Sequence, residues 1–126
     1  MKTYLILCVA IVCHHLVLAQ SNKSINAIEV SDVSVLNSFG YLTGYSVTFK
    51  NTSTKTIDYI GWTTNYFDNS GRLVKTEQNA FNSDSLIEPI VSGFEKTLYR
   101  TPGVKGASKA QIVVMDAHSV DGTKFK

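Results

Sequence analysis

The sequence predicts an all-β fold, a single antiparallel β-sandwich of about seven strands. Two observations lead to this prediction. Apolar and β-branched residues alternate with polar residues over short runs, as in strands that bury one face, and no run has the period of a long amphipathic helix. Glycine, asparagine and proline separate these runs at intervals of roughly 10–14 residues, which favours hairpins over alternating strand–helix units.

Three of the predicted strands lie in the first part of the domain. Residues 28–35 contain two short alternations, and the phase break at Ser31 and Asp32 indicates a bulge or a bend. Residues 45–49 alternate cleanly, and residues 57–67 give the strongest pattern. One face of 57–67, expected in the core, carries Ile60, Trp62, Thr64 and Tyr66, and the other carries Tyr59, Gly61, Thr63, Asn65 and Phe67.

The rest of the chain continues as strands joined by turns. Residues 68–71, Asp-Asn-Ser-Gly, are a strong turn signal and join 57–67 to a strand at 72–77 as a hairpin. Residues 78–92 are predicted as a loop with a short edge strand around Pro89. Strands at 94–100 and 110–120 follow, and residues 121–123 form the last turn.

The N-terminal residues have the composition of a signal peptide. Lys2 gives a positive start, residues 5–13 are an unbroken apolar run, and Val17 and Ala19 are small enough for the −3 and −1 positions of a cleavage site. An uncleaved anchor is the alternative, but a spanning helix needs about 20 apolar residues and this segment turns polar at Gln20. We therefore expect a signal peptide at 1–19, a short disordered lead-in at 20–26 and the β-sandwich domain at 27–126.

Removal of the signal peptide restricts the chemistry of the domain. Cys8, Cys13 and two of the three histidines lie in that peptide, which leaves no cysteine and only His118. Disulfides, thiol catalysis and multi-histidine metal sites are then excluded, and no cofactor or metal is expected. The formal net charge of +2 falls further with the loss of Lys2, so nucleic acid is not an expected partner. We expect a secreted or periplasmic protein without a membrane span after cleavage, and the lack of disulfides favours a bacterial one.

A catalytic site has little support in the sequence. His118 lies near Asp116, Ser119 and Asp121, which suggests a serine–histidine–aspartate triad. Spatial geometry defines such a triad, however, and neighbouring residues of a strand point to opposite faces. The turn at 68–70 offers oxygen ligands, but the spacing and the final glutamate of a calcium-binding loop are absent. The sequence therefore predicts that the protein is not an enzyme.

Aromatic residues are the better candidates for a functional surface. Phe39 and Tyr41 belong to a short apolar segment at residues 39–42, which we expect to form a loop tip that contacts a partner. Tyr59 and Phe67 lie on the face of the 57–67 strand opposite Trp62. If that face is open to solvent, these two side chains form a second candidate contact.

Three segments together resemble a known family. Residues 47–57 combine a strand with Asn-Thr-Ser and Lys-Thr-Ile, residues 66–71 are Tyr-Phe-Asp-Asn-Ser-Gly, and residues 121–123 are Asp-Gly-Thr. This order resembles the FxLYD-type and related immunoglobulin-like domains of bacterial secreted proteins, best over residues 45–74. The resemblance implies an immunoglobulin-like (fibronectin III-like) sandwich. Because such domains are mostly accessory modules, it implies a fold far more than an activity.

These observations together predict an exported, non-catalytic binding or structural accessory module at the cell envelope or outside the cell. Its expected partner is another protein of that compartment. The alternative is a small secreted hydrolase or an enzyme inhibitor. A hydrolase would gather His118 with a distant acid or serine in a concave pocket, whereas a binding module would expose an aromatic patch or an unprotected strand edge.

The predicted cleavage site gives a direct test of export. Because cleavage is expected after Ala19, N-terminal sequencing of secreted or periplasmic material should begin at Gln20. Recovery of the protein with Met1 intact would overturn the signal-peptide prediction.

Overall fold

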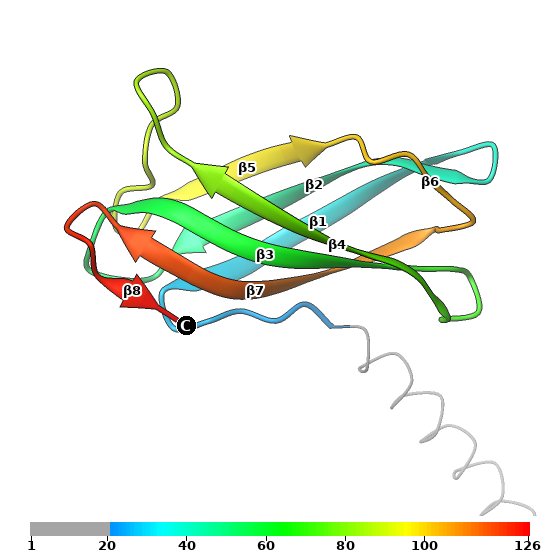
Figure 1. Cartoon of the computed structure of the whole chain (residues 1–126), viewed down its shortest axis with the longest axis horizontal. Coiled ribbons are helices and arrows are strands. Elements are labelled where there is room, and N and C mark those ends of the chain that lie inside the picture. Colours follow the sequence, from blue (N-terminus) through cyan, green and yellow to red (C-terminus); the bar gives the residue numbers. More distant parts are fainter. Residues whose placement is uncertain (1–20) are drawn as a thin grey trace, which may run out of the picture.

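The alternating runs form eight strands in two antiparallel sheets (Figure 1). A computed structural model describes residues 21–126, so the predicted signal peptide at 1–19 lies outside the described residues. The strands are β1 (Ile28–Ser38), β2 (Tyr41–Asn51), β3 (Ile57–Phe67), β4 (Leu73–Asn82), β5 (Glu95–Arg100), β6 (Val104–Lys105), β7 (Lys109–Ser119) and β8 (Lys124–Phe125). One sheet has the order β1–β2–β5, with β6 also pairing with β2, and the other has the order β4–β3–β7–β8.

The path of the chain between the sheets is that of an immunoglobulin-like sandwich, which confirms the predicted fold class. The links at 52–56, 83–94 and 106–108 carry the chain from one sheet to the other, and β1–β2, β3–β4 and β7–β8 are hairpins within a sheet. The loops therefore gather at the two ends of an elongated molecule (Figure 1). We call the end with turns 39–40, 68–72 and 101–108 the hairpin end, and the end with links 52–56 and 83–94 the crossover end.

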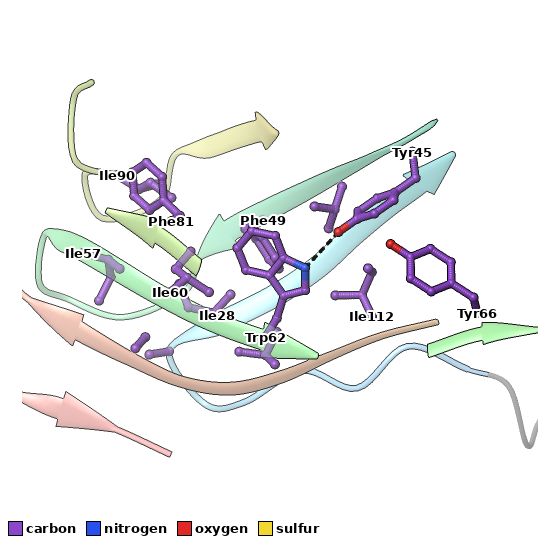
Figure 2. Packing of buried hydrophobic residues seen from close by; sticks show 14 of the residues in the cluster. Ile28, Tyr45, Phe49, Ile57, Ile60, Trp62, Tyr66, Phe81, Ile90 and Ile112 are labelled. Carbon is purple, nitrogen blue, oxygen red and sulfur yellow. Dashed lines mark hydrogen bonds between the residues drawn. The ribbon is translucent and has the colours of Figure 1, made fainter. Parts of the chain in front are cut away.

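The core forms because the inward faces of β2 and β3 carry large apolar side chains. Trp62, predicted to be in the core, is buried there and packs on Phe49, with ring centroids 5.1 Å apart. The indole Nε1 of Trp62 donates a hydrogen bond to the Tyr45 hydroxyl at 3.3 Å, so its one polar atom keeps a partner (Figure 2). Tyr66 meets Tyr45 edge to face at 6.2 Å. Ile60, Trp62, Thr64 and Tyr66 are all buried, which confirms the prediction that this face of β3 lies in the core.

Two segments differ from their predicted form because their pairing depends on partners far away in the sequence. β4 continues to Asn82, where the sequence predicts a loop from residue 78, because Phe81 is buried opposite Ile60 of β3. The polar residues before Phe81 lie at a sheet edge, so their local pattern is that of a loop. The edge strand predicted around Pro89 is reduced to a single bridge between Ile90 and Ile57. The bulge predicted at Ser31 is confirmed by a register shift there.

Residues 21–23 of the lead-in, for which the sequence predicts disorder, are instead bonded to β7. Lys23 forms a parallel bridge with Val113: its N–H donates to the Ile112 carbonyl and its carbonyl accepts from the Val114 N–H, both at 2.9 Å. The pairing has a physical reason, because β8 covers β7 only at Ala117 and His118. Without this pairing, the N-terminal half of β7 would leave backbone N–H and C=O groups unpaired at the sheet edge.

A single buried amide holds the crossover end together. The Asn51 Nδ2 donates to the carbonyls of Lys55 and Ile90, at 2.7 and 2.8 Å, and its Oδ1 accepts from the Ser53 N–H at 3.0 Å. The main chain of Asn51 also accepts from Gly93 and donates to Phe94. One side chain therefore joins the end of β2, the link to β3 and the loop between β4 and β5.

Substitution Asn51→Ala is expected to lower the free energy of unfolding by about 3 kcal/mol, because it leaves buried carbonyl and amide groups without partners. Asn37→Ala is the matched control: Asn37 is exposed and donates one hydrogen bond, to the Ser108 carbonyl. Its loss should cost about 0.5 kcal/mol. Urea unfolding of both variants measures the difference, and equal losses would contradict the role given to Asn51.

The turn predicted at residues 68–71 joins β3 to β4. The carboxylate of Asp68 orders it. Its Oδ1 accepts hydrogen bonds from the Ser70 hydroxyl at 2.7 Å and from the Arg72 N–H at 2.9 Å, and Gly71 adopts a φ of 85°. These bonds, the one from the Ser70 hydroxyl above all, lower the pKa of Asp68 to about 2. The ionised form is therefore the one that the folded turn prefers.

This preference predicts that the difference in melting temperature between the wild type and Asp68→Asn depends on pH. Because the folded pKa lies below the ordinary 3.8, the stabilisation from ionised Asp68 is complete above pH 3.8 and is lost as pH falls through about 2. The wild type should melt at a higher temperature than Asp68→Asn at pH 6, and the gap should close towards pH 2. A gap that stays constant across this range would show that the charge of Asp68 does not stabilise the turn.

Candidate functional site

Phe39 and Tyr41 lie where the sequence predicts, at the tip of the β1–β2 hairpin. Phe39 is 99% exposed and adopts a φ of 49°, the one positive φ of a non-glycine residue within 21–126. Tyr41 begins β2 and is 40% exposed. A fully exposed phenylalanine in the left-handed region gains nothing from burial in this domain. The tip is therefore available for contact, and the contact itself stays a prediction.

Tyr59 and Phe67 share the outer face of β3, but the structure does not bring them together. They lie at opposite ends of the strand, roughly 26 Å apart at 3.3 Å per residue. Tyr59 stacks on the His118 ring, with centroids 4.7 Å apart, and Phe67 lies beside Lys109 of β7. Both are partly buried by these neighbours. They do not form one aromatic patch.

An apolar groove on the outer face of the β1–β2–β5 sheet is a stronger feature, and the sequence analysis missed it. Its walls are Leu36 of β1, 71% exposed, and Tyr99 of β5, 74% exposed. Between them β2 contributes the small residues Gly44 and Ser46, which pair with Leu36 and Tyr99 respectively. The groove encloses about 300 Å³. Its apolar walls and narrow floor suit an apolar side chain of a ligand.

The groove depends on the absence of a side chain at Gly44. A Cβ at this position would lie 3.1 Å from the carbonyl oxygen of Arg100, so β5 approaches the β2 backbone closely here. Glycine inside a strand is a known signal of such an approach. A second signal is the phase of Tyr99, which follows Glu95 and Thr97 on the solvent side of β5. Either observation points to an exposed tyrosine beside a gap in the sheet surface.

The hairpin end that surrounds the groove is basic. Its cations are Arg72, Lys75, Arg100, Lys105 and Lys109. Two of these cations are paired with nearby acids: Arg72 with Asp68 at 3.2 Å and Lys75 with Glu77 at 3.5 Å. Glu77 also accepts a hydrogen bond from the Tyr66 hydroxyl at 3.2 Å. Burial, with smaller effects from Tyr45 and Glu77, raises the pKa of Tyr66, so this hydroxyl stays protonated. The Arg100 guanidinium lies over the Trp62 ring, 5.2 Å from its centroid, so the exposed Lys105 and Lys109 supply the solvent-facing positive charge of this end.

The residues around His118 do not form a triad. His118 is half exposed, and its Nε2 lies 3.9 Å from the nearest Asp116 oxygen. Ser119 is buried, and its hydroxyl donates to Asp121 rather than to the imidazole. On the outer face, the Tyr59 hydroxyl and the Asp116 carboxylate both lie over Gly61. His118 therefore lies beside a carboxylate and a phenol, and the Ser119 hydroxyl is bonded elsewhere.

Within residues 21–126, no group of three histidine, cysteine, aspartate or glutamate side chains is placed to hold a metal ion. The same residues contain no helix long and apolar enough to cross a membrane.

No protein-family model and no curated protein matches the sequence. The fold is similar to that of a DUF1425 family member from Shewanella sp. pv-4, with a TM-score of 0.51 and 16% identity over 73% of this chain and 80% of that one. It is also similar to a hypothetical protein from Peptoclostridium difficile 630, with a TM-score of 0.59 and 10% identity over 83% of this chain and 88% of that one. At these identities the likeness concerns the fold alone. The chain is thus a β-sandwich of a kind that also occurs in bacterial proteins, and no catalytic family is indicated.

Proposed function

We propose that the protein is an exported, non-catalytic binding module of the bacterial cell envelope, an FxLYD-type immunoglobulin-like domain that contacts another protein through the groove between Leu36 and Tyr99. The observation that carries this proposal is the exposure of both side chains on the outside of a complete core. Tyrosine and arginine are enriched at the centres of protein interfaces, and Tyr99 and Arg100 both line this groove.

The surroundings of the groove support a protein partner with an acidic contact surface. Arg100 lines the groove, and Lys105 and Lys109 lie at the same end of the sandwich. Their charges would steer an acidic surface towards the groove and raise the rate of association. Phe39 projects from the same end and would extend the contact beyond the groove. A hydrolase has less support, because Ser119 and His118 do not meet.

The position of the ordered lead-in supports export. The Ser21 carbonyl accepts a hydrogen bond from the Gln111 side chain at 2.8 Å, and Lys23 is bridged to β7. Cleavage after Ala19 would therefore release the domain with all of these contacts intact. Ser21, two residues after the predicted cleavage site, already bonds to β7, so the domain would begin almost directly after cleavage.

Site-specific photo-crosslinking in producing cells tests the binding surface. A benzophenone amino acid in place of Tyr99 should give a discrete crosslinked product, because this position faces the groove. The same probe in place of Gln78, which is exposed on the outer face of the other sheet, should give none. Leu36→Asp in the chain probed at position 99 should abolish the product while changing the free energy of unfolding by about 0.5 kcal/mol or less. Equal products at both positions, or none at position 99, would refute the proposal.

A further inference from the structure

The crossover end carries a second exposed apolar feature, in the link between β4 and β5. Leu86 is 92% exposed there, yet its turn is well defined. The Asp84 carboxylate accepts the N–H groups of Leu86 and Ile87 at 2.7 and 2.8 Å, and the Asp84 N–H donates to the Ile87 carbonyl at 2.9 Å. We call residues 84–87 the Leu86 turn. It rises from the body of the sandwich at the upper left of Figure 1.

This turn presents an apolar side chain in a fixed position. Because its backbone is already held by the Asp84 carboxylate, binding through Leu86 would require little further ordering, and ordering is a main cost of association. A leucine kept in solvent on an ordered turn does not contribute to the core. It has the properties of an anchor for a complementary pocket.

The charges near the Leu86 turn are opposite to those of the hairpin end. Residues 83–94 contain Asp84 and Glu88 and no lysine or arginine. The groove, in contrast, lies at the end that carries Arg72, Lys105 and Lys109. The two features also lie at opposite ends of the molecule, with the β1–β2 hairpin at the right of Figure 1 and the Leu86 turn at the left. One chain thus carries an acidic apolar projection and a basic apolar groove.

We propose that these two surfaces bind each other between copies of this chain, so that the Leu86 turn of one copy enters the groove between Leu36 and Tyr99 of the next. The inference rests on the proposed function, because it uses the same groove and names its occupant. The volume of about 300 Å³ lies at the lower end of ligand pockets, which suits a projecting side chain better than a helix. The acidic residues of the β4–β5 link and the exposed Lys105 and Lys109 of the hairpin end favour this orientation over contact between two copies of the same end.

The contact is heterologous, since it joins different surfaces of the two copies. An open assembly of this kind always keeps one groove and one Leu86 turn free at its ends. It therefore grows head to tail unless its geometry closes a ring. Growth of this kind depends on protein concentration. It should also weaken with salt, because the opposite charges at the two ends become screened.

Substitutions at two exposed positions test the two sides of the contact independently. Leu86→Asp removes the projection, and Leu36→Asp places a charge in the groove wall. Both positions are exposed, so both variants should fold, which unfolding curves verify. Leu73→Asp is the matched control, because Leu73 is also an exposed leucine, at 58%, but lies outside both surfaces. The protein is purified as the producing cells process it and studied by analytical ultracentrifugation.

The expected pattern is specific to head-to-tail assembly. The wild type and Leu73→Asp should form oligomers that grow with concentration, and Leu86→Asp and Leu36→Asp should each associate at least tenfold more weakly. An equimolar mixture of the last two variants should form a dimer and grow no further, because it combines one intact groove with one intact turn. Self-association that survives Leu86→Asp, or a mixture that stays monomeric while the wild type associates, would overturn the inference.

The same experiments keep this inference separate from the proposed function. If the wild type is monomeric at all concentrations while the probe at position 99 crosslinks a different protein in cells, the groove is a binding site but its occupant is not a second copy. If position 99 gives no product in cells and the purified protein does not associate, both proposals fail. If the crosslinked product has twice the mass of this chain and Leu86→Asp abolishes it, both are supported.

Discussion

The hydrogen bonds of the Asn51 amide are the constraint on which the rest of the structure depends. They fix the link from β2 to β3, which moves the chain between the sheets, and the loop from β4 to β5, which returns it. Since the Asn51 main chain also pairs with Gly93 and Phe94, it sets the register in which β5 joins β2. That register brings Tyr99 opposite Ser46 and so builds one wall of the groove. A buried residue at one end, through its side chain and its main chain, thereby shapes a surface towards the other.

The core is complete without the surface aromatics. Trp62, Tyr45 and Thr64 are linked by hydrogen bonds through the Tyr45 hydroxyl, and among residues 21–126 no buried side-chain nitrogen or oxygen lacks a partner. Polar groups inside a sandwich are costly when unpaired, so this network allows aromatic residues with polar atoms to fill the core. The exposed Phe39 and Tyr99 are therefore not left over from a poorly formed interior. Their exposure leaves them free for contacts outside the domain.

Local patterns predicted the strands well, because alternation along one strand records which face it buries. The burial of Trp62 and the turn at Asp68 follow from neighbours within a few residues. The features that were missed depend on pairing between distant segments. The order of Lys23 comes from an unfilled edge of β7, the extension of β4 comes from Phe81 opposite Ile60, and the groove comes from Gly44 aligned between two other strands. Of these three features, only the groove is indicated by a single residue in the sequence, Gly44 inside a strand.

The pairing of the lead-in with β7 also bears on when the domain becomes complete. The hydrogen bonds of Ser21 and Asn22 join residues 90 positions apart, because their partners lie on β7, one of the last strands of the chain. A chain that emerges N-terminus first, from a ribosome or a translocation channel, holds this segment without its partner until β7 follows. Contacts of such sequence separation form late and slowly. This edge of the second sheet would therefore close only when nearly all of the chain had emerged.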